Sequence, residues 1–67
     1  MDLVVNGKKT EVGECHSVAQ LVAELELTSA VVAVELNRRI IPRRQHETTT
    51  LSSGDEVEIV TLVGGGT

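Results

Sequence analysis

The dipeptide Asn6-Gly7 constrains the fold of this chain more than any other short stretch of its sequence. Asn-Gly readily adopts the positive φ angles that a two-residue type I′ turn requires, and such a turn joins two antiparallel strands directly. Residues 3–5 before the turn are apolar, and residues 8–12 after it continue as a strand-like stretch. The sequence therefore predicts a β-hairpin at residues 3–12, so part of the fold is a sheet.

One amphipathic helix is predicted after the hairpin. Ser17 and Gln20 have the spacing of a capping box, in which each residue satisfies a backbone N–H at the start of a helix. Apolar residues then follow at the i, i+3, i+4 and i+7 positions of one helical face: Val18, Leu21, Val22 and Leu25. This stripe predicts a helix that packs against one face of the sheet.

Three further strands are predicted in the second half of the chain. Residues 30–34 are apolar on both faces, which favours a covered strand over an edge strand. Residues 40–41 form a short strand that Pro42 ends, because proline lacks the N–H of a strand ladder. The polar stretch 43–51 is predicted to be a loop with room for one helical turn, and the last strand covers residues 56–63.

The order of these elements predicts an α+β fold. A mixed sheet of four to five strands wraps over one helix in a β-grasp arrangement, with the first and last strands parallel at its centre. The predicted division is a β-grasp domain at residues 1–63 and a flexible C-terminal glycine tail at residues 64–67.

Composition excludes several classes of function. Among 67 residues there are one cysteine and two histidines, which cannot form an internal disulfide and lack metal-ligand spacing. The chain has no aromatic residue and a net charge of −4, so it lacks the rings and the positive charge that bind nucleic acid. No stretch suits an export signal or a membrane span. We expect a cytoplasmic protein that binds no metal, nucleic acid or membrane and meets a basic partner surface.

Few side chains have catalytic potential. Cys15 and His16 are neighbours that point to opposite sides of an extended segment, so they are poorly placed to form a thiolate–imidazole pair. Glu14 beside them also disfavours a reactive thiolate. We interpret Cys15 as structural or exposed, and His46 as an ordinary solvent-exposed histidine.

Four of the six basic residues surround Pro42. We interpret them as a solvated surface that offsets nearby Glu35 and Glu47, and the alternative is partner recognition, because guanidinium groups favour carboxylates at interfaces. The four are Arg38, Arg39, Arg43 and Arg44.

The last predicted strand has two different faces. Alternation places Val57, Ile59, Thr61 and Val63 on one face and Glu56, Glu58, Val60 and Leu62 on the other. The second face changes from acidic to apolar just before the tail. Either another segment of the domain covers Val60 and Leu62, or the two form a docking patch that positions the tail.

The tail contains Gly64, Gly65 and Gly66. Phosphate cradling is excluded, because a phosphate loop opens a helix and this run opens none. One alternative is an ordinary disordered chain end. The other is a segment without side chains that threads a narrow channel and presents a backbone carboxylate to an active site on another protein.

These features together resemble the ThiS family of ubiquitin-like β-grasp sulfur carriers from thiamine biosynthesis. The resemblance covers nearly the whole chain and is carried by the order of five stretches: "VNG", "SVAQLVAELEL", "VVAVELNRRIIPRR", "LSSGDEVEIVTLV" and the terminal glycines. A related family, the small subunit of molybdopterin synthase, usually has prolines before its diglycine, where this chain has Leu62-Val63.

The resemblance implies a carrier and not an enzyme. A partner adenylating enzyme would use ATP and magnesium to activate the Gly66 carboxylate, while this chain itself binds no cofactor. A persulfide from a donor such as a cysteine desulfurase would then convert Gly66 to a thiocarboxylate, and a thiazole synthase would take the sulfur. Gly65 and Gly66 match the diglycine of the family, and Gly64 matches its common third glycine. Val60, Leu62, Gly64 and Arg43 are the predicted partner-binding residues.

Thr67 departs from the family pattern, because members normally finish at the second glycine of the pair. A glycine-sized channel should reject a β-branched residue. We favour removal of Thr67 by a peptidase, and the alternatives are an inactive precursor or a carrier for another pathway, such as cysteine or molybdopterin synthesis. A ubiquitin-like protein modifier and a non-covalent adaptor that uses Val60, Leu62 and the arginines are also consistent with the sequence.

Overall fold

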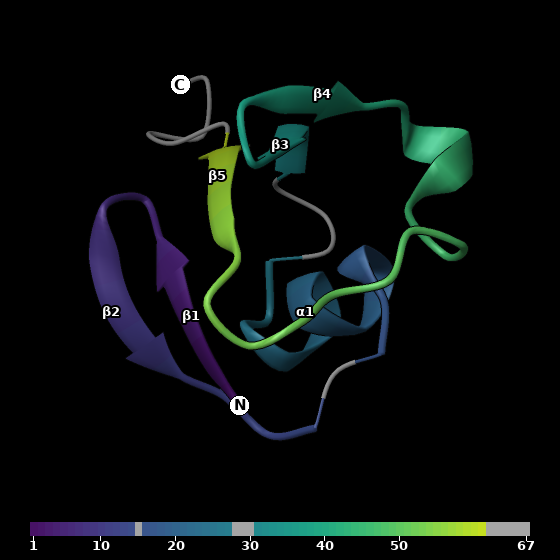
Figure 1. Cartoon of the computed structure of the whole chain (residues 1–67). Helices are drawn as coiled ribbons and strands as arrows, with labels where there is room; N and C mark the ends of the chain where they lie inside the picture. The colour runs from purple at the N-terminus through teal and green to yellow at the C-terminus, as the bar shows by residue number, and fades with distance from the viewer. Residues whose placement is uncertain (15, 28–30, 62–67) are drawn as a thin grey trace.

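The computed structural model describes residues 1–14, 16–27 and 31–61, and it shows a sheet whose one face is covered by a short helix (Figure 1). Within these residues the sheet has five strands, in agreement with the predicted four to five. The elements in chain order are β1 (Asp2–Val5), β2 (Lys8–Glu11), α1 (Val18–Glu24), β3 (Val31–Leu36), β4 (Arg39–Ile41), the 3-10 helix η1 (Arg43–Gln45) and β5 (Glu56–Thr61).

The strand order across the sheet is β2-β1-β5-β3-β4. β1 and β5 run parallel, while β1–β2, β3–β4 and β3–β5 are antiparallel pairs. The first and last strands are therefore parallel neighbours inside the sheet, with β5 in the middle position. These pairings confirm the predicted α+β β-grasp fold.

Element boundaries differ modestly from the sequence-based expectations. β3 continues through Leu36, two residues beyond the predicted end at Val34, because Glu35 and Leu36 pair with both β4 and β5. Residues 62–67 lie outside the described residues, so the end of the predicted strand 56–63, the domain limit at residue 63 and the tail at 64–67 stay predictions.

The two hairpins share one turn geometry. Asn6 and Gly7 have φ angles of 53° and 80°, which confirms the predicted type I′ turn. Asn37 and Arg38, between β3 and β4, have φ angles of 50° and 71°. Arg38 thus occupies a left-handed position that favours glycine. A turn before the strand at residues 40–41 was predicted from residues 35–39, but its tight two-residue geometry was not.

The start of α1 is capped as predicted. The Ser17 hydroxyl accepts from the Gln20 backbone N–H at 3.2 Å, and the Gln20 side-chain oxygen accepts from the Ser17 N–H at 3.1 Å. The next two N–H groups, of Val18 and Ala19, donate to the Thr49 and His46 carbonyl oxygens. The loop after η1 therefore completes the N-terminus of the helix, whose first N–H groups have no partner within the helix itself.

The end of α1 is a Schellman motif. The N–H groups of Glu26 and Leu27 donate to the carbonyl oxygens of Ala23 and Val22, and Glu26 adopts a φ of 59°. Leu27 packs against the core. The motif thus turns the chain back toward the sheet.

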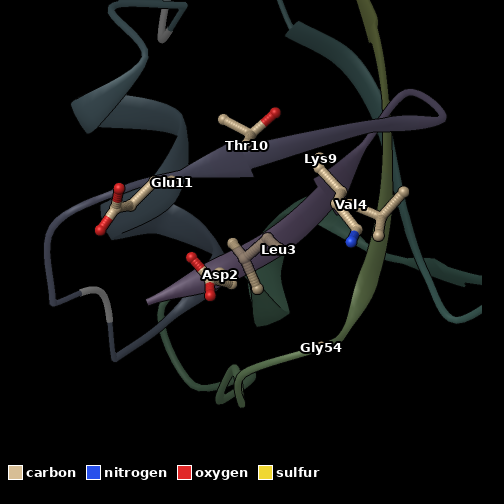
Figure 2. A pocket seen from close by; sticks show the side chains of 7 residues that line it. All are labelled: Asp2, Leu3, Val4, Lys9, Thr10, Glu11 and Gly54. Carbon is tan, nitrogen blue, oxygen red and sulfur yellow. The ribbon is translucent and has the colours of Figure 1, made fainter.

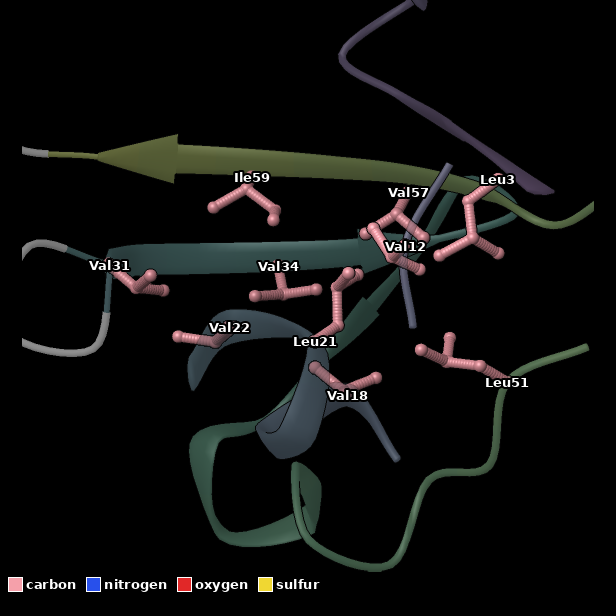
Figure 3. Packing of buried hydrophobic residues seen from close by; sticks show 10 residues of the cluster. All are labelled: Leu3, Val12, Val18, Leu21, Val22, Val31, Val34, Leu51, Val57 and Ile59. Carbon is pink, nitrogen blue, oxygen red and sulfur yellow. The ribbon is translucent and has the colours of Figure 1, made fainter. Parts of the chain in front are cut away.

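The core lies between α1 and the sheet (Figure 3). Val18 and Leu21 of the helix and Val34 of β3 are fully buried, whereas Leu25, at the end of the predicted stripe, is only partly buried because it is the C-cap. The buried hydrophobic residues are Leu3, Val12, Val18, Leu21, Val22, Val31, Val34, Leu51, Val57 and Ile59.

His46 differs from its sequence-based interpretation as an ordinary exposed side chain. It is half-buried, and its Nε2 lies 3.0 Å from the Ile41 carbonyl oxygen. The predicted loop 43–51 contains one helical turn, η1, as the sequence analysis allowed. This turn brings His46 back to β4. His46 therefore helps to hold the loop against the sheet.

Candidate functional site: the outer face and C-terminal end of β5

β5 is the strand that leads toward the glycine tail, and its two faces differ as predicted. Val57 and Ile59 point into the core and are 1% and 5% exposed. Val60 lies on the opposite face and is 52% exposed, so the alternative in which another segment covers Val60 is wrong. Leu62, the second residue of the predicted patch, lies outside the described residues.

Strand register extends this opposite face over β3 and β4. Val60 pairs with Ala33, and Glu58 pairs with Glu35, which in turn pairs with Ile40 of β4. We call this surface, directed away from α1, the outer face; it comprises Ala33, Glu35, Ile40, Glu56, Glu58 and Val60. It combines two exposed aliphatic side chains with three carboxylates.

Ile40 was missed as a candidate by sequence reasoning. It is 70% exposed, more than any other large hydrophobic residue that the structure describes. β4 has only three residues, which is too short for alternation to show which face each side chain occupies. Its exposure could be predicted only from the knowledge that Ile40 pairs with Glu35.

The C-terminal end of β5 is held by β3. Val60 pairs with Ala33 and Thr61 pairs with Val31, with a register irregularity between Val31 and Ala33. On the other side, β1 pairs with β5 only as far as Val5 and Val57. The strand is therefore bonded to β3 up to the last described residue.

Arg43 contributes to this end of the sheet. Its Nη2 donates to the Val31 carbonyl oxygen at 2.8 Å, opposite Thr61. A guanidinium fixed in this way supports β3 opposite the last described residue of β5, and its predicted contact with a partner stays a prediction. Arg38, Arg39 and Arg44 are exposed.

Two turn asparagines bond the backbone of β5 from opposite sides. Asn6, from the β1–β2 turn, bonds the N–H and the carbonyl of Ile59 through its side-chain amide. Asn37, from the β3–β4 turn, accepts from the Glu56 N–H at 3.0 Å and donates to the Asp55 carboxylate at 3.2 Å. Asn37 thus bonds the first residue of the strand, and Asn6 bonds Ile59, two residues before the strand ends at Thr61.

A shallow pocket lies on the β1–β2 hairpin (Figure 2). The residues that line it include Val4, Lys9, Asp2 and Glu11, and Gly54 lies at one side. Val4 pairs with Glu56, at the start of β5. Of the predicted site residues that the structure describes, Val60 and Arg43 do not line this pocket.

The predicted site residues Gly64, Gly65, Gly66 and Thr67 lie outside the described residues, as does Cys15, which we interpreted as structural or exposed. His16 is exposed, and in the described ranges 1–14, 16–27 and 31–61 no three His, Cys, Asp or Glu side chains gather closely enough to hold a metal ion. Within those same ranges, the structure has no helix long and apolar enough to cross a membrane.

Comparison with known proteins gives consistent matches over almost the whole chain. The family model described as "ThiS family" matches residues 2–66. The crystal structure of the thiamine biosynthesis protein ThiS from Geobacter metallireducens is similar with a TM-score of 0.80 and 38% identity, over 98% of this chain and 100% of that one.

Two curated relatives show the same similarity. The sulfur carrier protein ThiS of Bacillus subtilis is 35% identical over 65 residues, which are 96% of this chain and 98% of that protein. A thiazole synthase of Paramagnetospirillum magneticum is 38% identical over 66 residues, which are 98% of this chain but only 20% of that protein. The chain therefore spans about a fifth of the length of this second relative.

Proposed function

This chain belongs to the ThiS family, and we propose that it is the sulfur carrier of a thiamine biosynthesis pathway. The observation that carries the proposal is the match to ThiS of Geobacter metallireducens, with a TM-score of 0.80 over 98% of this chain. The run Gly64–Gly66, which the family model includes, supplies the terminus that such a carrier needs.

In the proposed reaction, this chain is the substrate of other enzymes. A carboxylate is a poor electrophile, so an adenylating enzyme first joins the Gly66 carboxylate to the AMP part of ATP, with magnesium bound to the phosphates, and pyrophosphate leaves. A persulfide sulfur then attacks the acyl carbon and expels AMP. A thiol cleaves the resulting S–S bond and leaves a thiocarboxylate on Gly66. The chain carries the sulfur and catalyses none of these steps.

The outer face is the proposed docking surface for the adenylating enzyme. Val60 is exposed, and the carboxylates of Glu56 and Glu58 precede it on the same face. Apolar contact at Val60 and attraction between these carboxylates and a basic partner surface would orient the carrier. Leu62, Gly64 and Arg43 are proposed to extend the contact toward the entrance of the active site.

A thiazole synthase is the proposed acceptor of the sulfur. One relative of this chain is a stretch within a protein named thiazole synthase. A carrier in the same polypeptide as its acceptor meets that acceptor at a high effective concentration. Such an arrangement supports direct transfer of sulfur from a carrier to a thiazole synthase. We propose the same contact here between separate partners.

Activation of Gly66 requires that its carboxylate be free. In the sequence, Thr67 follows Gly66, so the acyl group of Gly66 is part of a peptide bond until Thr67 is removed. We propose that a peptidase removes it before adenylation.

Intact-mass spectrometry tests the proposed function. A chain that ends at Gly66 is incubated with the adenylating enzyme from the same genome, ATP, magnesium, a cysteine desulfurase, cysteine and a thiol. The expected product carries one sulfur in place of one oxygen, located on Gly66 by fragmentation. The matched control ends at Thr67 and should remain unmodified. Absence of the product from the shorter chain would overturn the proposal, and covalent adducts with lysines of other proteins would indicate a protein modifier instead.

A further inference from the structure

Asn6 makes an unusual set of contacts with β5. Its backbone N–H donates to the Val57 carbonyl oxygen at 2.8 Å. This bond lies directly after the last β1–β5 residue pair, Val5 and Val57. Its side chain then reaches one step further along β5: Oδ1 accepts from the Ile59 N–H at 2.7 Å, and Nδ2 donates to the Ile59 carbonyl oxygen at 3.3 Å.

The side-chain amide of Asn6 thus takes the place of a backbone peptide group. An asparagine amide carries one acceptor oxygen and a donor nitrogen, the same pair that a neighbouring strand would offer. β1 itself cannot supply that pair, because the chain turns at Asn6, where φ is 53°. The amide therefore prolongs the β1 side of β5 beyond the last paired residue, Val57.

We propose that Asn6 is a positioning residue that fixes the direction in which β5 delivers the glycine tail to the adenylating enzyme. This inference rests on the proposed function. Ile59 is adjacent to Val60 of the outer face and precedes Gly64 by only five positions. Among the described residues, the two Asn6–Ile59 bonds are the hydrogen bonds nearest to the tail on the β1 side of β5.

Without the Asn6 side chain, the end of β5 is bonded only to β3. It then exchanges between its present position and frayed ones in which Val60 no longer keeps its present direction. Only the bonded fraction of molecules is competent to bind, so the apparent affinity falls in proportion to that fraction. Once bound, the carrier reacts as before, so the effect belongs to KM and not to kcat.

Asn37 provides a matched control. It is also the first residue of a type I′ turn with a positive φ, and its side chain also bonds the backbone of β5. Its partner is Glu56, at the opposite end of the strand from the tail. Removal of the Asn37 side chain therefore removes a comparable contact without loosening the tail.

The experiment compares Asn6→Gly and Asn37→Gly in chains that end at Gly66. Glycine tolerates positive φ, so both turns are preserved. We expect Asn6→Gly to raise the KM of the adenylating enzyme for the carrier about tenfold, with kcat within about twofold of the original value. Amide hydrogen exchange at Ile59 should become faster in the free protein. Asn37→Gly should leave the KM within about twofold, even where the two variants lose similar thermal stability.

Each outcome decides the proposal. An unchanged KM in Asn6→Gly, or equal KM increases in both variants, would overturn it, because the second result indicates a general loss of stability. If Asn6→Gly does not fold, Asn6→Asp keeps an acceptor for the Ile59 N–H and places a carboxylate oxygen against the Ile59 carbonyl, and the same KM increase is expected. An original chain that is not adenylated at all would overturn the proposed function and the positioning role together, while Ile59 exchange still reports on the contact itself.

Discussion

The two faces of β5 are built for different tasks. On the core face, Val57 and Ile59 are 1% and 5% exposed and pack among residues from both halves of the chain. On the outer face, Glu58 and Val60 are exposed. Residues that alternate along one strand therefore divide between the core and the proposed docking surface, so substitutions at adjacent positions should have separate effects.

This division suits a small protein whose proposed role is to present a reactive terminus. A domain of this size rarely has more than roughly 3–5 kcal/mol of net stability. It therefore tolerates little loss of core packing, and residues that contact a partner are better placed outside the core. Placement of β5 between β1 and β3 holds the strand on both edges. The outer face can then remain exposed without weakening the strand that leads to the tail.

The largest expected effect concerns the core face. Ile59→Ala removes buried aliphatic atoms and leaves a cavity beside Val34, its partner in β3, so we expect the free energy of unfolding to fall by about 3 kcal/mol. Urea denaturation measures this loss. Val60→Ala is the control and should cost less than about 1 kcal/mol. Equal losses for both variants would contradict the division between the faces.

The next effect concerns the outer face. Val60→Lys keeps an aliphatic stem but places a positive charge where a basic partner surface is proposed, so the KM of the adenylating enzyme for the carrier should rise about tenfold. The free energy of unfolding should stay within about 1 kcal/mol, because Val60 is 52% exposed. Val60→Ile, the control, should leave KM nearly unchanged. A normal KM for Val60→Lys would exclude Val60 from the docking surface.

A smaller effect is expected at Glu58. Glu58→Gln keeps the shape of the side chain and removes its charge, so KM should rise about threefold at low salt. The difference from the original protein should shrink as salt is added, because salt screens exposed charges. Steady-state kinetics at several salt concentrations measure this dependence. A salt-independent change would indicate that the carboxylate acts through a local contact.

The smallest effect tests how far the docking surface extends. Ile40→Thr replaces a residue that is 70% exposed with another β-branched one, so the stability should change little. We expect KM to rise about twofold, which would show that the docking surface includes β4. An unchanged KM would confine the surface to β3 and β5.

Local sequence signals predicted much of this structure. The Asn6-Gly7 turn, the capping box at Ser17 and Gln20 and the parallel placement of the first and last strands all agree with the observed elements. Each of these signals depends on residues close together in sequence or on general rules of strand connection. Alternation along the strand likewise placed Val60 opposite the core face, but it left open whether another segment covers this residue.

The features that sequence reasoning missed depend on distant segments. The bond between Asn6 and Ile59 joins residues 53 positions apart and requires that β1 and β5 be neighbours. Arg38 adopts the φ of a type I′ turn although its side chain disfavours it, because the pairing of β3 with β4 fixes a two-residue connection. His46 is half-buried for a similar reason, since η1 returns it to β4.

The middle position of β5 has a consequence for how the protein is made. β5 is the last of the five strands in chain order, yet it joins the β1–β2 hairpin to the β3–β4 hairpin. While the ribosome has released only residues up to 55, the nascent chain can form two separate hairpins and no common sheet. The sheet therefore closes only when the segment next to the glycines has been synthesised, so the domain is complete only once nearly all of its chain has left the ribosome.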